Sequence, residues 1–106
     1  MQSYTLLGTA EIPMDQTQWV AFWLSKGFQH RDTEWGGVLR FEALTVEYET
    51  DWEPFKNDVN AFLFKGQLVD DLDLPVLFVD HIQSLGGQLN LDLFGDAARL
   101  VRRFVL

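Results

Sequence analysis

Residues 70–87 and residues 88–94 differ in hydrophobic period, and this change constrains the fold more than any other feature of the chain. In the first segment, apolar side chains recur at helical spacing; Asp73 can cap the helix, Pro75 lies in its first turn and Gly86 ends it. The stripe consists of Leu74, Leu77, Phe78, His81, Ile82 and Leu85. The second segment, QLNLDLF, alternates apolar and polar residues as a half-buried strand does. A helix and a strand with one apolar face each predict helices layered on a sheet.

The N-terminal part of the chain repeats this combination of a strand with a helix. Residues 3–12 (SYTLLGTAEI) have the composition of a strand. Asp15 can then cap a helix, Gln18 follows three residues later as in a capping box, and Gly27 supplies a left-handed stop. The apolar face of this expected helix carries Trp19, Phe22 and Trp23.

Residues 28–50 are expected to form an extended hairpin. FQHRDTEW (28–35) would run out, Gly36-Gly37 would turn, and VLRFEALTVEYET (38–50) would return. In the return segment the apolar residues shift from odd to even positions. Those at odd positions are Leu39, Phe41 and Ala43, and those at even positions are Leu44, Val46 and Tyr48. A bulge near 43–44 would place all six on one face and the intervening acids in solvent.

The remaining segments are less regular. Residues 51–69 fit either a helix, begun by Thr50 and Glu53 as a capping box, or a turn followed by a strand. Asp96 can cap a final helix, AARLVRRFV, whose closing arginines would complement its dipole. The sequence therefore predicts one two-layer α+β domain over 1–106, with a largely antiparallel sheet of about three to five strands and about three helices.

Charge is the second strong constraint, because the net charge of −8 is unevenly placed. Residues 42–96 hold twelve of the sixteen acids against two lysines, whereas residues 97–106 contain three arginines and no acid. Such a field disfavours direct binding to nucleic acid or to anionic membranes, and it attracts basic partners. Apolar runs are only a few residues long and the N-terminus has no basic region, so we expect neither a membrane span nor a secretory signal.

Catalytic and metal-binding patterns are missing from the sequence. There is no cysteine, no phosphate loop, no dinucleotide fingerprint and no nucleophile elbow. His30 and His81 share no ligand spacing, and Asp70, Asp71 and Asp73 lack the glycine and glutamate of a calcium loop. We therefore expect no catalytic residue, no metal and no cofactor, and predict that the chain is not an enzyme. A small-molecule site would require a concave apolar pocket, which the sequence cannot show.

Acids and aromatic residues gather in EALTVEYETDWEPF, residues 42–55. The predicted partner-binding residues are Glu42, Glu47, Glu49, Asp51, Trp52 and Glu53. Trp35, next to Glu34, resembles Trp52 in lying at a turn beside acids; such tryptophans either close the ends of the core or serve as interface anchors within an acidic rim. The second candidate patch consists of Asp70, Asp71 and Asp73.

These features favour a cytoplasmic, non-catalytic binding protein that stoichiometrically inhibits or neutralises a basic, nucleic-acid-handling protein, such as a nuclease or a nucleic-acid-guided complex. Immunity proteins and phage anti-defence proteins, including anti-CRISPR proteins, combine small size and acidity in the same way; the analogy concerns composition alone. The alternative is a structural or adaptor module that forms a homodimer or joins a larger assembly. In that case the arginines of RLVRRFVL (99–106) would pair with the acids of a neighbouring copy.

Overall fold

The computed structural model describes residues 1–52 and 59–106, which form a seven-stranded antiparallel sheet and two α-helices. The sheet has the order β2-β3-β4-β5-β1-β6-β7. Its strands are β1 (Ser3–Ile12), β2 (Gln29–Asp32), β3 (Gly36–Phe41), β4 (Leu44–Thr50), β5 (Asn60–Val69), β6 (Gln88–Phe94) and β7 (Leu100–Val105). The helices are α1 (Gln16–Ser25) and α2 (Asp73–Ser84). The prediction of a two-layer α+β architecture is confirmed, but the strand number was too low and the helix number too high.

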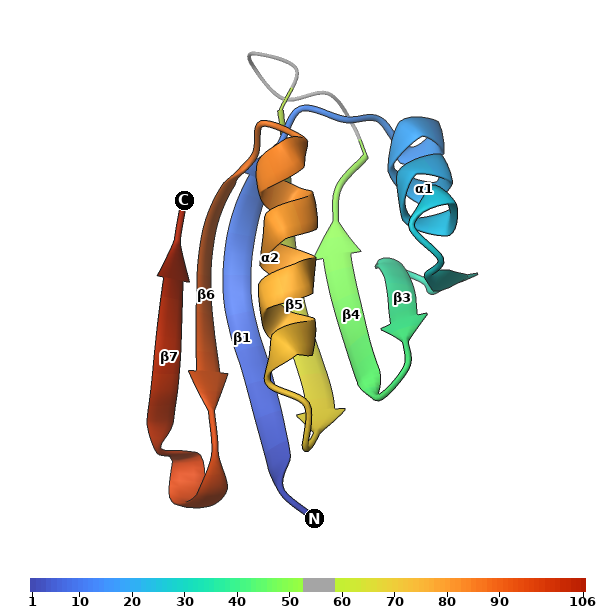
Figure 1. Ribbon diagram of the computed structural model, residues 1–106. Helices are drawn as coiled ribbons and strands as arrows, with labels where there is room; N and C mark the ends of the chain where they lie inside the picture. Colours follow the sequence, from blue (N-terminus) through green and yellow to red (C-terminus); the bar gives the residue numbers. More distant parts are fainter. Residues whose placement is uncertain (53–58) are drawn as a thin grey trace.

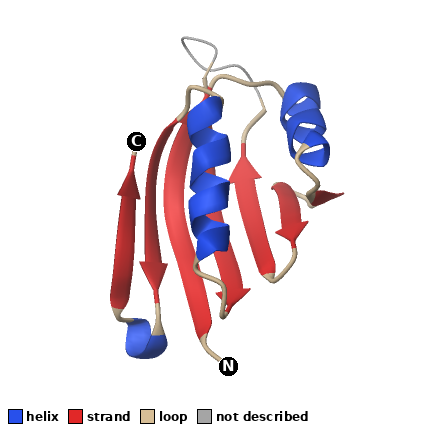
Figure 2. Cartoon of the chain, in the orientation of Figure 1, coloured by secondary structure: helices blue, strands red, loops and turns tan. Residues whose placement is uncertain are grey.

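Both helices lie on the same side of the sheet, so that one face is covered and the other is open (Figures 1 and 2). Helix α2 lies over the middle of the sheet, in front of β1 and β5 in Figure 1, and α1 lies toward the β2–β3 end. Strand β1 occupies the interior of the sheet, where it pairs with β5 and with β6. Buried and exposed side chains alternate along β5, so that every second side chain lies under the helices and the others lie on the open face.

The core between the layers is unusually aromatic. Trp19 and Trp23 of α1 are fully buried, and their rings meet edge to face with centroids 5.4 Å apart. Trp23 also stacks on Phe78 of α2 at 5.1 Å. Trp19 lies 4.4 Å from Phe62 of β5, between ring centroids. The predicted helix face of α1 is therefore confirmed, and it connects both helices to the sheet.

The helix ends follow the expected signals in most respects. Asp15 caps α1 by accepting from the Gln18 backbone N–H at 2.8 Å, and the Gln18 side chain returns the bond to complete the capping box. Gly27 follows α1 with a positive φ of 86°. In α2, however, Asp73 is the first helical residue, and Asp71 accepts from the Asp73 N–H at 2.9 Å. The expected Asp73 cap is therefore wrong: the N-cap residue is Leu72, which makes no side-chain cap hydrogen bond.

The phase change in residues 38–50 arises from a turn and not from a bulge. Phe41 pairs with Leu44, so a two-residue turn of Glu42 and Ala43 joins β3 to β4. Glu42 has a φ of 52°, as the first central residue of a type II′ hairpin turn does. The glycines expected to turn, Gly36 and Gly37, instead begin β3.

The expected C-terminal helix is wrong. Residues Asp96–Ala98 form one short 3-10 turn, in which Ala97 and Ala98 have φ values of 55° and 56°, and the chain continues as β7. Strand β7 pairs with β6, and Phe104 supplies its buried side chain opposite Leu91. The open edge of β6 offers a full ladder of backbone hydrogen bonds, which a nine-residue surface helix would leave unused.

Of the two structures considered for residues 51–69, the strand is the one observed for its described part, since β5 begins at Asn60. The proposed capping box of Thr50 and Glu53 involves a residue outside the described ranges. Neither α1 nor α2, the helices of the described part, is long and apolar enough to cross a membrane.

Candidate partner-binding surface

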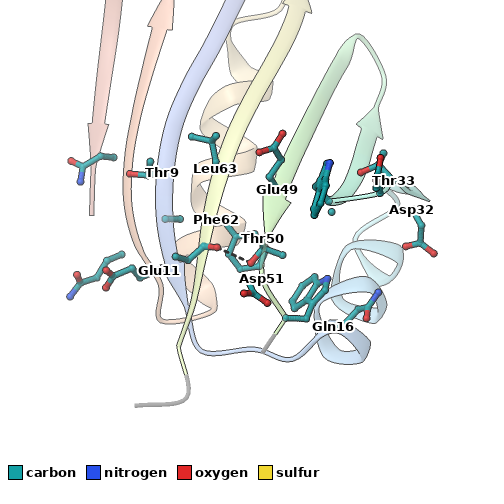
Figure 3. Close-up of a pocket in the computed structure, with 18 residues that line it drawn as sticks. Thr9, Glu11, Gln16, Asp32, Thr33, Glu49, Thr50, Asp51, Phe62 and Leu63 are labelled. Carbon is teal, nitrogen blue, oxygen red and sulfur yellow. Dashed lines mark hydrogen bonds between the residues drawn. The ribbon is translucent and has the colours of Figure 1, made fainter. Parts of the chain in front are cut away.

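A concavity with a volume of about 1100 Å³, lined by described residues, lies at one end of the open sheet face (Figure 3). Antiparallel pairing sets its floor, because Leu63 of β5 lies between Glu49 of β4 and Thr9 of β1. The turn between β2 and β3 forms one wall. In Figure 3, Glu49 lies between Leu63 and Thr33 of this turn. The concavity therefore combines segments that are far apart in the sequence.

Every charged residue in the described lining of this concavity is a carboxylate. Its acidic members are Glu11, Asp32, Glu34, Glu49 and Asp51. No lysine or arginine occurs among its described lining residues. In the described part of the chain, Asp92 forms an ion pair with Arg103, and His30 Nδ1 lies 3.8 Å from an Asp32 carboxylate oxygen; neither contact involves Glu11, Glu34 or Glu49. We call this region the acidic concavity.

Apolar surface lies among these acids. Trp35, in the β2–β3 turn, has 68% of its surface exposed, and Leu63 on the floor has 52% exposed. Trp52 is half-buried and packs edge to face on Phe62, with ring centroids 5.5 Å apart. An exposed tryptophan beside carboxylates can contact the face of a cationic group and the apolar stem that carries it.

Backbone hydrogen bonds hold the β2–β3 turn against β4. The Thr33 N–H donates to the Gly36 carbonyl at 3.1 Å, which closes the turn. The Thr50 N–H donates to the Trp35 carbonyl at 3.0 Å, which ties the turn to the end of β4. Trp35 is thus exposed in its side chain, while its backbone is held against β4.

A buried pair beneath the turn adds to this anchoring. His30 Nε2 lies 2.6 Å from the Tyr48 hydroxyl, and a Cβ on Gly37 would come within 2.7 Å of both groups. Gly37 is therefore required by the close approach of these side chains. Burial raises the pKa of Tyr48 to about 12, while burial lowers the pKa of His30 against the opposing influence of Asp32. Both groups are consequently neutral near pH 7.

The acids predicted from residues 42–53 do not form one continuous ridge. Glu47 and Glu49 lie on the open face of β4, but Glu42 lies in the turn before β4 and Asp51 follows its other end. Glu47 is directly opposite Lys65 of β5, so its charge has a cationic neighbour. Of this predicted set, the acidic concavity contains Glu49, Asp51 and Trp52, while Glu53 lies outside the described residues.

The second predicted patch serves local structure. Asp70 accepts from the Gln2 N–H at 2.6 Å, and its own N–H donates to the Gln2 carbonyl at 2.8 Å. Asp71 accepts a hydrogen bond from the Asp73 N–H at the start of α2. Asp70 follows Val69, the last residue of β5, whereas Asn60 begins this strand at its other end. None of Asp70, Asp71 and Asp73 lines the acidic concavity.

Sequence reasoning missed three acids of the concavity, Glu11, Asp32 and Glu34, because only the strand order brings them to the same end of the sheet. Trp35 beside Glu34 was the one local signal. Among the described residues, no group of histidine and acidic side chains has an arrangement that could hold a metal ion. The chain matches no protein-family model, and comparisons with curated proteins and with solved structures found no significant match.

Proposed function

We propose that this chain is a non-catalytic binding protein that stoichiometrically neutralises a basic, nucleic-acid-handling protein through its acidic concavity. The observation that carries the proposal is the composition of the described lining, which gathers five carboxylates and two tryptophans without a lysine or an arginine. Interfaces of this kind place aromatic anchors within a polar rim, and complementary charge selects the partner.

The geometry suits a lysine or arginine side chain of the partner. Its aliphatic stem would lie on Leu63, and its cationic head would reach Glu49 and Glu34 of the β2–β3 turn. Trp35 would contact the same cation from the rim, a contribution of about 0.5–1 kcal/mol at an exposed site. Several such contacts, each modest alone, add to the attraction exerted by the net charge of −8.

A nucleic-acid-handling partner follows from the same electrostatics. Nucleases and nucleic-acid-guided complexes present clusters of lysine and arginine that bind phosphates. Carboxylates spaced along strand ends can occupy such a cluster, and the exposed indole of Trp35 can take the place of a stacked base. The chain would then compete with nucleic acid for the same basic surface, and the cytoplasm is where we expect the two proteins to meet.

The test is capture of partners from lysates of the native host and its phage or competitor strains, at low and at high salt. Wild type is compared with Glu49→Lys, which reverses a charge in the acidic concavity, and with Glu42→Lys, which reverses one in the distant β3–β4 turn. Both variants have the same net charge of −6, so a difference between them reports position and not overall charge.

We expect wild type and Glu42→Lys to capture a basic nucleic-acid-handling protein at low salt, and Glu49→Lys to lose it. The captured protein should release its nucleic acid as the chain is added, with an end point at a fixed stoichiometry. Equal loss in both variants would reduce the proposal to a general charge effect. Recovery of nothing but further copies of the chain would contradict the proposal and favour the alternative, a structural module.

A further inference from the structure

The two edges of the sheet differ in how well they are protected from pairing with another strand. Strand β2 has only four residues, and all but the half-buried His30 are exposed and polar. Strand β7, at the other edge, has six residues and no proline or lysine (Figure 1). Its exposed apolar residues, together with the following Leu106, are Leu100, Val101, Val105 and Leu106. A long apolar edge is a ready template for a further strand.

The backbone of β7 presents hydrogen-bonding groups to solvent at defined positions. The Leu106 N–H donates to the Leu89 carbonyl at 2.9 Å, and the register continues as Phe104 opposite Leu91. Backbone groups alternate in direction along a strand, so Phe104 and Leu106 bond to β6 while Arg103 and Val105 point away from it. The irregularity in the β6–β7 ladder lies before Arg102, which leaves residues 102–106 regular.

We propose that two copies of this chain pair antiparallel through β7, with the two Phe104 residues opposite one another at the twofold axis. This register places Arg103 opposite Val105 of the copy, and these outward-facing residues would exchange two pairs of hydrogen bonds. It keeps the helices of both copies on one side of a continuous sheet. The assembly also stops at two copies, because the pairing uses the β7 edge of each copy and leaves no unpaired β7 edge for a third.

Charge does not oppose this register. Arg103 is held by Asp92 of β6 through bonds of 2.8 and 3.3 Å, so its charge is neutralised within each copy. Arg102 lies over the ring of Phe104, with 4.4 Å between the guanidinium carbon and the ring centroid. In the pair it would face Leu106 of the copy. No like charges are therefore directly opposite, and two aromatic rings meet at the axis.

This contact differs from a pairing of C-terminal arginines with the acids of another copy, and salt separates the two. A contact between arginines and acids dissociates as salt rises. The β7 pairing rests on backbone bonds and apolar contacts between two copies that each carry a net charge of −8, so salt should leave it intact or strengthen it. It also leaves the acidic concavity free, because β7 does not line it.

The experiment measures mass by sedimentation from micromolar to millimolar protein, at low and high salt, for wild type, Val105→Lys and Leu24→Lys. Val105 is 63% exposed and Leu24, on α1, is 54% exposed, so neither change should unfold the chain; thermal unfolding verifies this. A lysine at 105 would remove the apolar side chain of Val105 from both contacts about the axis and would place a further cation opposite the Arg103–Asp92 pair of the copy. We expect its dissociation constant to rise at least about tenfold, with Leu24→Lys unchanged.

Amide hydrogen exchange supplies an independent reading on wild type. The N–H groups of Arg103 and Val105 should become protected as the concentration of wild-type protein rises, whereas they should exchange freely in dilute solution. A monomer at every concentration would overturn the proposal. So would dimerisation of Val105→Lys that matches wild type, or protection of these amides that does not depend on concentration.

Discussion

Replacement of Trp23 by alanine should come close to unfolding this protein. The Trp23 side chain is fully buried, and its ring contacts Trp19 and Phe28 as well as Phe78 of α2, at centroid distances of 5.4, 4.7 and 5.1 Å. Truncation of a buried tryptophan costs about 3–5 kcal/mol, through lost burial and the cavity that remains. A domain of this size has a free energy of unfolding of about 5–15 kcal/mol, so the loss is a large part of the total.

The assay is urea unfolding followed by far-ultraviolet circular dichroism, which does not depend on tryptophan emission. The matched control is Leu24→Ala, the next residue of α1, which is largely exposed and should change stability by within about 0.5 kcal/mol. Trp23→Phe should cost less than Trp23→Ala, because it keeps the ring stacking and removes an indole N–H that has no acceptor among the described residues. A cost for Trp23→Ala as small as that of Leu24→Ala would refute the account of the core.

Three further outcomes follow from the structure. Gly37→Ala should lower the free energy of unfolding by about 1–3 kcal/mol, because its Cβ would separate His30 from Tyr48; an unchanged urea midpoint would contradict this. Partial burial lowers the pKa of both His30 and His81, so the unfolded chain binds more protons than the folded chain below about pH 6.5. The free energy of unfolding, measured by urea titration, should therefore fall as the pH drops below this value of about 6.5; a flat profile between about pH 7 and about pH 5 would contradict the lowered pKa of these histidines. Glu47→Lys should weaken partner capture less than Glu49→Lys does, because Lys65 already lies opposite Glu47. A larger loss with Glu47→Lys than with Glu49→Lys would instead place the interface nearer Glu47 on β4.

The parts of the fold that could be predicted from sequence were those whose signals are local. The capping box of Asp15 and Gln18 and the apolar stripe of α2 each lie within a few residues, and both helices formed where expected. The strand at residues 88–94 alternates without interruption and was also predicted correctly. Such patterns depend on backbone periodicity alone, so they need no knowledge of the partner strands.

The C-terminal segment shows where local reasoning fails. Leu100, Val101 and Phe104 have a spacing that fits one face of a helix, and arginines in a last turn complement the helix dipole. The outcome was instead decided by the unpaired edge of β6 and by the pairing of Arg103 with Asp92, which also lowers the pKa of that carboxyl group. Both are tertiary contacts, and they override a short segment of ambiguous pattern.

The acidic concavity could be predicted only in part for a related reason. Glu49 and Asp51 are close in sequence to Trp52 and were recognised as a group. Glu11 and Asp32 belong to β1 and β2, and they reach the same end of the sheet only through its strand order. Antiparallel register over several strands is a long-range property, which a single sequence does not determine.

The central claim is that the acidic concavity binds cationic side chains, and amide chemical-shift mapping by NMR during titration with an arginine- and lysine-rich peptide tests it most directly. We predict saturable shifts at Thr33–Trp35, Glu49 and Leu63, little change at Asp70–Asp73, and loss of these shifts in Glu49→Lys but not in Glu42→Lys. Shifts spread over all acidic residues alike, or centred on Asp70–Asp73, would contradict the account.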